Sequence, residues 1–185
     1  ILNGLDAAAD DPAVSAVLVV IDTPGGTTTG GESIYRELRR IGENGVPMVA
    51  VIRNVGASAG YMIALGTDRI YALETSITGS IGVLLETAEV SGLLERLGVT
   101  AETFRSGPLK GQPTPFAPLN DQARAATQSL VDDIYNWFLA VFAERRGLSL
   151  DVARGLADGR AYTGRQALAL DLIDAIGGER EALQW

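Results

Sequence analysis

Short apolar runs alternate with helix-like segments along the chain, and this alternation restricts the possible folds more than any other feature. Residues 14–21 and 47–53 are rich in Val and Ile, which predicts two buried parallel strands. Residues 69–72 and 100–105 predict shorter strands, and residues 78–85 predict another strand that begins at glycine-rich sequence. Strands that alternate with helices over short connections predict an α/β fold with right-handed parallel crossovers.

A long helix is predicted over residues 119–146, after a loop at residues 106–118 that contains four prolines. Its apolar stripe is expected in the core or in a subunit contact and consists of Ile134, Trp137, Phe138, Val141 and Phe142. Further helices are predicted at residues 31–40, 57–66, 91–97, 150–157 and 164–170. Residues 1–9 also resemble part of a helix and lack an initiating Met, so we expect a chain trimmed at its N-terminus.

Composition excludes several classes of function. The chain has 185 residues, which suits one domain with a sizeable core. It contains no Cys and no His, so it can form neither a Ser-His-Asp or Cys-His triad nor a His or thiolate metal site. Its formal net charge of −8 argues against nucleic-acid binding and against binding to anionic membranes through basic patches.

Lys110 is the single lysine among the 15 basic residues, and all the others are arginines. Lysine can act as a base once a desolvated site removes its proton, whereas arginine effectively stays charged. Two interpretations are therefore open, a general base or a surface lysine in an arginine-rich chain. The count alone favours the surface lysine.

Ser58 lies in the sequence Gly-Ala-Ser-Ala-Gly, between a predicted strand and a predicted helix. Small neighbours permit the sharp turn that exposes a serine hydroxyl, and the spacing fits the G-x-S-x-G nucleophile elbow of α/β-hydrolases. Those enzymes need a His base, which this chain lacks. A capping serine in a tightly packed turn explains the same sequence, so both interpretations stay open.

Two further junctions of small residues follow predicted strands. The glycines after Pro24 allow backbone N–H groups to face a developing oxyanion, although Pro-Gly turns are also common in ordinary loops. Ser80 suits either a structural cap or a hydroxyl partner for another polar group. Lys110 lies on the proline-rich loop, and loops are where functional residues concentrate. Together with Ser58, these features favour a hydrolase with a Ser-Lys dyad.

Six motifs run along the chain in the order found in one known family: residues 21–26 (IDTPGG), 56–61 (GASAGY), 78–83 (TGSIGV), 106–110 (SGPLK), 158–167 (DGRAYTGRQA) and 172–174 (LID). On these motifs the chain resembles the bacterial signal peptide peptidase A family of serine peptidases. The resemblance implies a Clp-protease/crotonase-like fold of repeated ββα units, with a mostly parallel sheet flanked by helices. It also implies a single peptidase domain over residues 1–185, with the long helix after the proline-rich loop.

The resemblance implies a role for each residue of the dyad. Ser58 would be the nucleophile that forms an acyl-enzyme, and Lys110 would be its general base. Ser80 would hold the Lys110 amine by a hydrogen bond. The 52 positions that separate Ser58 from Lys110 suit the shorter, single-dyad form of the family.

The remaining site residues also follow from the resemblance. Gly26 and Ala59 would supply the N–H groups of the oxyanion hole. Gly82 and Val83 would line a groove that binds substrate as an extended strand. The motif at residues 158–167 would be structural, with Arg160 anchoring its turn. No metal and no cofactor are implied.

The resemblance implies a serine endopeptidase that hydrolyses remnant signal peptides or other unstructured apolar peptides. It implies a homo-oligomer whose active sites lie near subunit contacts, with the lysine acting within or across subunits. We expect a bacterial membrane-associated protein with its catalytic domain on the extracytoplasmic side, anchored by a segment absent from this chain. A soluble cytoplasmic protein is the alternative. We also expect the family's strand before the first helix to lie outside this sequence.

Two alternatives belong to other functional classes. An acyl-CoA enzyme of the crotonase type would use the glycine-rich oxyanion hole with Glu74 or Glu86, and would need neither Ser58 nor Lys110. A non-catalytic assembly domain would have lost the activity, which the intact serines and lysine disfavour.

Overall fold

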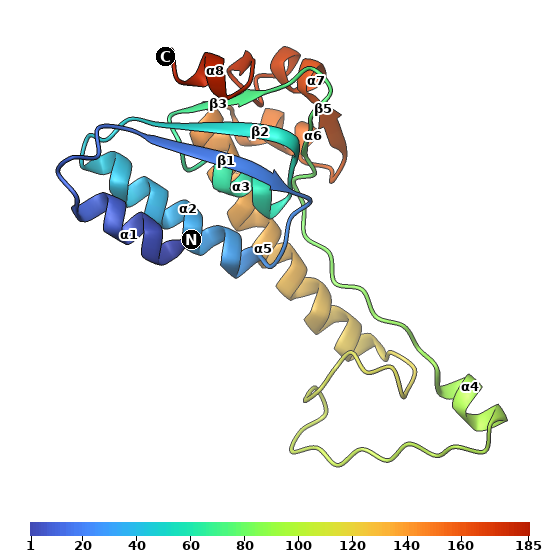
Figure 1. Cartoon of the computed structure of the whole chain (residues 1–185). Coiled ribbons are helices and arrows are strands. Elements are labelled where there is room, and N and C mark those ends of the chain that lie inside the picture. Colours follow the sequence, from blue (N-terminus) through green and yellow to red (C-terminus); the bar gives the residue numbers. More distant parts are fainter. The chain divides into compact units, whose positions relative to one another are not determined.

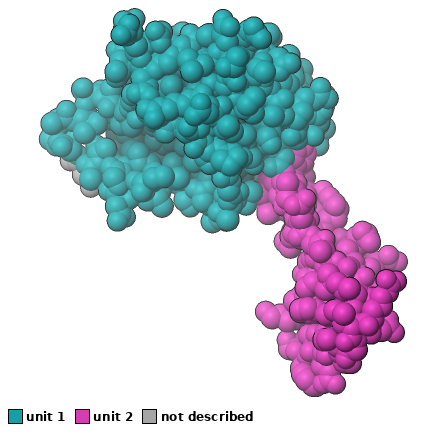
Figure 2. All heavy atoms as spheres, turned by 45° about the vertical axis from the view of Figure 1, so that its right-hand side comes forward, with its two compact units in different colours: residues 1–82, 137–185 teal, residues 83–136 magenta. Residues whose placement is uncertain are grey.

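The computed structural model describes residues 1–185, apart from the side chain of residue 10. It divides into two compact units, coloured separately in Figure 2. The first unit comprises Ile1–Gly82 and Trp137–Trp185 and contains the sheet. The second unit comprises Val83–Asn136. The helix α5 (Asp121–Arg146) begins in the second unit and ends in the first.

The strand β2 (Met48–Ala57) is central to the sheet of the first unit, because three other strands pair with it. β1 (Val17–Thr23) lies parallel to it on one side. On the other side, residues 49–52 of β2 pair with β3 (Arg69–Ala72), and residues 55–57 pair with β4 (Ile77–Gly79). Both of these pairings are parallel.

Two short strands complete the sheet, in the order β5-β4-β2-β3-β6 with β1 paired to β2. β5 (Ala161–Thr163) is antiparallel to β4, and β6 (Ala175–Ile176) is parallel to β3. Because β2 changes partner from β3 to β4 along its length, the sheet curls. The expected α/β fold with a mostly parallel sheet and flanking helices is confirmed.

Helices cover both faces of the sheet (Figure 1). α1 (Leu2–Asp10) packs on α2 (Thr28–Glu43), which in turn packs on α3 (Ala59–Ala64) on the same side of the strands. α8 (Glu179–Ala182) packs on β2 at the opposite face. Between α5 and β6 lie two more short helices, α6 (Leu150–Leu156) and α7 (Gly164–Ala169).

Alternating side chains of the strands enter two apolar clusters, as expected for a sheet buried on both faces. The cluster under α1 and α2 has Leu38, Ile41 and Met48 at its centre, with Val17 and Val19 packed against it. The cluster under α8 consists of Val49, Val51, Tyr71 and Ala182, with Leu18 packed against it. Val17, Leu18 and Val19 of β1 therefore face alternate sides of the sheet.

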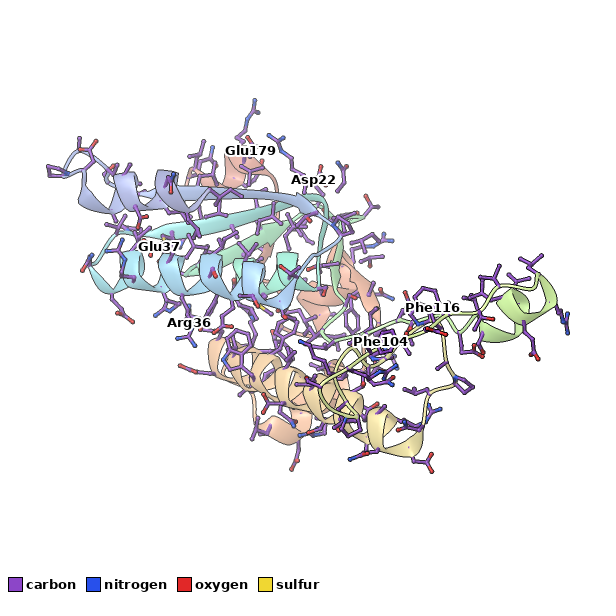
Figure 3. All side chains as sticks on the ribbon, turned by 90° about the horizontal axis from the view of Figure 1, so that it is seen from below. Asp22, Arg36, Glu37, Phe104, Phe116 and Glu179 are labelled. Carbon is purple, nitrogen blue, oxygen red and sulfur yellow. The ribbon has the colours of Figure 1, made fainter. Side chains whose placement is uncertain are left out.

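The second unit contains α4 (Ser91–Arg96) and the start of α5, joined by chain without helix or strand. The amide of Val90 donates to the carbonyl of Pro115 at 2.8 Å, and Asn120 Oδ1 caps α5 by accepting from the amide of Ala123 at 2.8 Å. Many apolar side chains here are exposed, including Leu84, Leu85, Leu93, Leu97, Val99, Phe104 and Phe116. Phe104 is 93% exposed, and Figure 3 labels it together with Phe116.

One predicted element is wrong. Residues 100–105 are predicted as a strand, but they form neither helix nor strand in the structure. Their sequence favours an extended backbone, yet a strand exists only where a neighbour accepts and donates the backbone hydrogen bonds. No described segment pairs with them. Similarly, the strand predicted at residues 78–85 is limited to β4, which starts at Ile77 and ends at Gly79.

The apolar stripe of α5 agrees with its predicted role in the core. Phe138, Val141 and Phe142 are buried, whereas Ile134 and Trp137 are half-buried. Phe142 meets Tyr61 of α3 edge to face, with ring centroids 6.0 Å apart. Among the described residues, no helix combines the length and the hydropathy needed to cross a membrane.

Candidate active site

Ser58 occupies the junction between the end of β2 and the start of α3. Its backbone angles are φ 52° and ψ −120°, a conformation that residues other than glycine adopt rarely and at a cost in energy. Its amide donates to the carbonyl of Gly79 at 2.9 Å, and its carbonyl accepts from the amide of Met62 at 3.0 Å. The strand-to-helix turn predicted from the small residues is therefore present, with the half-buried serine at its apex.

The turn after β1 packs directly on this serine. Gly25 has a φ of +126°, and a Cβ built on it would lie 2.9 Å from Ser58 Cβ and 3.4 Å from Ser58 Oγ. A Cβ on Gly60 would lie 2.7 Å from Cγ2 of Thr23. Only glycine fits at these two positions, so the glycines on either side let β1 and α3 approach each other closely around Ser58.

Two backbone amides at this junction are available to a ligand. Ala59 follows Ser58 as the first residue of α3, and Gly26 follows Gly25. Within the described part of the chain, neither the Ala59 nor the Gly26 amide has a hydrogen-bond acceptor. Free amides beside a nucleophile are what an oxyanion hole requires.

Ser80 lies beside Ser58, because Gly79 at the end of β4 pairs with Ala57 at the end of β2. Ser80 also has a positive φ, of 50°, and its amide donates to the carbonyl of Arg160 at 2.8 Å. Gly79 has a φ of +77°, and a Cβ there would lie 2.6 Å from the ring of Tyr162. The antiparallel strand β5 therefore fixes the backbone that carries Ser80.

The turn before β5 is held by an ion pair. Asp158 Oδ2 accepts from Arg160 Nε at 2.8 Å, and this hydrogen bond holds the pKa of the Asp158 carboxyl below its ordinary value. The hydroxyl of Tyr162 donates to the carbonyl of Leu156 at 2.9 Å. Arg160 thus anchors this turn through its side chain, while its carbonyl holds Ser80.

The predicted site residues divide between the two units. Gly26, Ser58, Ala59, Ser80 and Gly82 belong to the first unit, where the first four are carried by adjoining turns. Gly82 lies beside Gly159, since a Cβ on it would be 3.4 Å from the Gly159 Cα.

Lys110 and Val83 belong to the second unit. The Lys110 amide donates to the carbonyl of Gly107 at 3.1 Å in a turn of the proline-rich loop, and its side chain is exposed in this unit. The roles assigned to the site residues from the resemblance stay predictions. The two carboxylates considered for an acyl-CoA enzyme, those of Glu74 and Glu86, are both exposed. Glu74 Oε2 lies 3.9 Å from Nη1 of Arg165.

Sequence reasoning missed Asp22, which lies at the end of β1 (Figure 3). Its carboxylate accepts from Asn54 Nδ2 at 2.7 Å and from the amide of Val55 at 3.2 Å, both in β2. The available signal was an acidic residue next to the Pro-Gly-Gly turn, together with the polar pair Arg53-Asn54 that interrupts the apolar run of β2.

Comparison with known protein families shows which family this chain belongs to. The family model described as "Peptidase family S49" matches residues 40–185, which include Ser58, Ser80 and Lys110. The chain belongs to peptidase family S49. Its curled, mostly parallel sheet is consistent with the Clp-protease/crotonase-like fold, and the resemblance to signal peptide peptidase A is confirmed at family level.

Several curated proteins are similar to most of this chain. It is 40% identical over 170 residues (92% of the chain) to a provisionally named protease of Synechocystis sp., and 38% identical over 174 residues (94%) to a provisionally named signal peptide peptidase SppA of Enterococcus faecium. It is 30% identical over 174 residues (94%) to protease 4 of Haemophilus influenzae. The chain spans 61%, 51% and 28% of these three proteins, respectively.

Proposed function

We propose that this chain is a serine peptidase domain in which Ser58 attacks the carbonyl carbon of a peptide bond. The observation that carries the proposal is the position of Ser58 on a turn of positive φ, with Gly25 packed against it and the amides of Gly26 and Ala59 without acceptors among the described residues. This arrangement suits nucleophilic attack followed by stabilisation of an oxyanion.

In the proposed reaction, the neutral amine of Lys110 takes the proton from Ser58 Oγ as the oxygen attacks the carbonyl carbon. The carbonyl oxygen becomes an oxyanion that accepts from the amides of Gly26 and Ala59. When the C–N bond breaks, the leaving amine takes the proton from Lys110, and the acyl group stays on Ser58. Water then attacks the ester, with Lys110 again as the base, and releases the acid and the free serine.

Lys110 is the base in this proposal because the resemblance to the signal peptide peptidase A family implies that role, and the chain contains no His that could serve instead. Ser80 would hold the amine of Lys110, and its backbone is fixed beside that of Ser58 through β4. A lysine amine acts as a base only where it is shielded from water. We propose that assembly provides this environment.

The proposed substrate is an unstructured apolar peptide, such as a remnant signal peptide, bound in an extended conformation along Gly82 and Val83. The name of the Enterococcus faecium relative, a signal peptide peptidase, supports this class of substrate. Residues 80–90 contain no helix or strand, so the backbone next to Ser80 has amides and carbonyls that an extended peptide can pair with.

We also propose that the domain acts as a homo-oligomer, with the active sites near the subunit contacts. The exposed apolar side chains of the second unit support this, because burial of apolar surface is the main driving force of protein association. Lys110 is carried by that same unit.

The proposal is tested by peptide turnover with Lys110→Arg, which keeps the charge but removes the base. Turnover should fall by at least about 100-fold, the usual contribution of general base catalysis. Arg96→Lys is the matched control, since it exchanges the same two residue types at an exposed position of the same unit, and it should keep wild-type activity.

The pH profile gives a second readout of the same proposal. Wild-type turnover should rise with pH, because a general base must be unprotonated to accept the serine proton. Turnover that survives Lys110→Arg, or a profile that is flat from acid to alkaline pH, would remove Lys110 from the mechanism.

A further inference from the structure

The strand β2 is sharply bent at the point where it passes from one neighbour to the next. A Cβ built on Gly56 would lie 2.8 Å from Cγ1 and Cγ2 of Ile52, four residues earlier in the same strand. In a straight strand, residues four apart are separated by about 13 Å. The backbone between Ile52 and Gly56 is therefore sharply bent, and at this corner β2 passes from pairing with β3 to pairing with β4.

The pairing of β1 with β2 shifts register at the same corner. Ile21 pairs with Ile52, but Thr23 pairs with Gly56. A single residue of β1, Asp22, therefore faces the three residues of the corner. A bulge of this kind leaves backbone groups without their ladder partners.

The carboxylate of Asp22 supplies the missing acceptor. It accepts from the amide of Val55 at 3.2 Å and from the side-chain amide of Asn54 at 2.7 Å. One side chain of β1 thus holds both the backbone and a side chain of the corner. Asp22 itself is exposed, so it does not act by filling the core.

Two catalytic segments leave this corner. On β2, Gly56 and Ala57 lead directly to Ser58. On β1, Thr23 leads to the Pro24–Gly25–Gly26 turn. The Gly25 amide donates a hydrogen bond to Thr23 Oγ1 at 3.3 Å. Gly25 then rests against Ser58.

We infer that Asp22 is a positioning residue, which sets the Gly26 amide relative to Ser58 Oγ by fixing the corner between β1 and β2. The inference rests on the proposed function, in which that amide binds the oxyanion. Small displacements of an oxyanion donor reduce the rate of the chemical step and leave ground-state binding of the peptide largely unchanged.

The test compares Asp22→Ala with Asp22→Asn and with Asp11→Ala. Asp22→Ala removes both acceptors, whereas Asp22→Asn keeps an oxygen for the Val55 amide. Asp11 is the matched control, because its exposed carboxylate also accepts from a backbone amide, that of Ala13 at 2.8 Å, but it precedes the opposite end of β1.

For Asp22→Ala we expect kcat to fall by about 10- to 100-fold with KM within about twofold of wild type. A peptide aldehyde, which forms an oxyanion-like adduct on the serine, should lose affinity by a similar factor. Asp22→Asn should recover most of the loss, and Asp11→Ala should match wild type. An unchanged kcat in Asp22→Ala, or an equal loss in Asp11→Ala, would overturn the inference.

Amide hydrogen exchange on the same variants separates this inference from the proposed function. Peptides covering residues 22–27 and 53–57 should exchange faster in Asp22→Ala than in wild type or Asp11→Ala, whether or not the chain hydrolyses peptides. If wild type shows no turnover, the proposed function fails, and unchanged exchange in Asp22→Ala would separately show that Asp22 does not hold the corner.

Discussion

Two serines with positive φ lie on adjacent strand ends, at 52° for Ser58 and 50° for Ser80. Each such residue costs about 1–3 kcal/mol and persists only where its surroundings hold it. Here the holding contacts are backbone hydrogen bonds, from Ser58 to Gly79 and from Ser80 to Arg160. This strain at two hydroxyl-bearing residues is typical of a functional site.

Gly25 offers a test of this packing at the level of one residue. Gly25→Ala should reduce the free energy of unfolding by about 1–3 kcal/mol, because the new methyl group meets Ser58 Cβ at 2.9 Å and the φ of +126° is strained for alanine. Gly155→Ala is the control, since it lies in α6 with no atom within 4 Å of a new Cβ. It should raise the same free energy by up to about 1 kcal/mol.

Denaturant unfolding measures both changes. A Gly25→Ala variant as stable as wild type, with unchanged reactivity of Ser58, would show that the turn does not pack on the serine.

At the level of elements, the buried Tyr61 fixes the position of the helix α3 through a hydrogen bond and a ring contact. Tyr61 is fully buried, its hydroxyl donates to the carbonyl of Leu172 at 2.6 Å, and its ring packs on Phe142 of α5. Because α3 begins directly after Ser58, these contacts also fix the helical side of the turn that carries Ser58. Burial raises the pKa of the Tyr61 hydroxyl far above its ordinary value.

The loss of stability at alkaline pH should therefore depend on Tyr61. Above about pH 10 the unfolded chain loses the phenol proton while the folded chain keeps it, so the free energy of unfolding falls as pH rises. Tyr61→Phe should make this fall shallower. Near pH 7 the same variant should lose about 1–3 kcal/mol, since the buried Leu172 carbonyl loses its donor.

Chemical unfolding at a series of pH values, with Tyr135→Phe as the control for a half-buried tyrosine, provides the measurement. An equal slope for wild type and Tyr61→Phe would contradict this account.

The elements that sequence predicts well are those whose own residues decide their conformation. Residues 69–72 form β3 with the predicted ends, and the predicted long helix is α5 with its start two residues later. β5 and β6 were not foreseen because three and two residues are too few to show a periodicity. The strand predicted at residues 100–105 is absent, because a strand forms only where a neighbouring segment pairs with its backbone.

The site was predictable to a similar extent. Small-residue turns after strands identified Ser58, Ser80 and the Pro-Gly-Gly segment from local sequence, and the structure brings their backbones together. Asp22 could not be found in this way, because its role depends on a bend in β2 that is visible only in three dimensions.

At the level of the whole molecule, the proposed nucleophile and its proposed base belong to different units of the chain. Ser58 lies in the unit that has the sheet and two apolar clusters, and Lys110 lies in the unit whose apolar side chains are largely exposed. The proposed activity therefore depends on what the second unit binds, and we propose that it binds other copies of this chain.

Light scattering of the purified chain tests this assembly. Its mass should be a multiple of 19.4 kDa, and Phe104→Ser should shift it toward a monomer. Phe104 is 93% exposed, so this change removes little packing within the chain itself. Leu150→Ser, an exposed apolar position of the first unit, is the control and should assemble as wild type does. A monomer at every concentration would refute the proposed oligomer.

Intact-mass spectrometry after incubation with a serine-reactive fluorophosphonate tests the central claim most directly. Wild type, Ser58→Ala and Lys110→Arg are compared under the same conditions, with folding checked by circular dichroism. The account predicts one adduct on Ser58 of wild type and none on either variant, because the nucleophile needs both its own hydroxyl and the lysine base. An adduct that persists in Lys110→Arg, or a folded wild-type protein that takes up no label, would contradict a Ser58–Lys110 dyad.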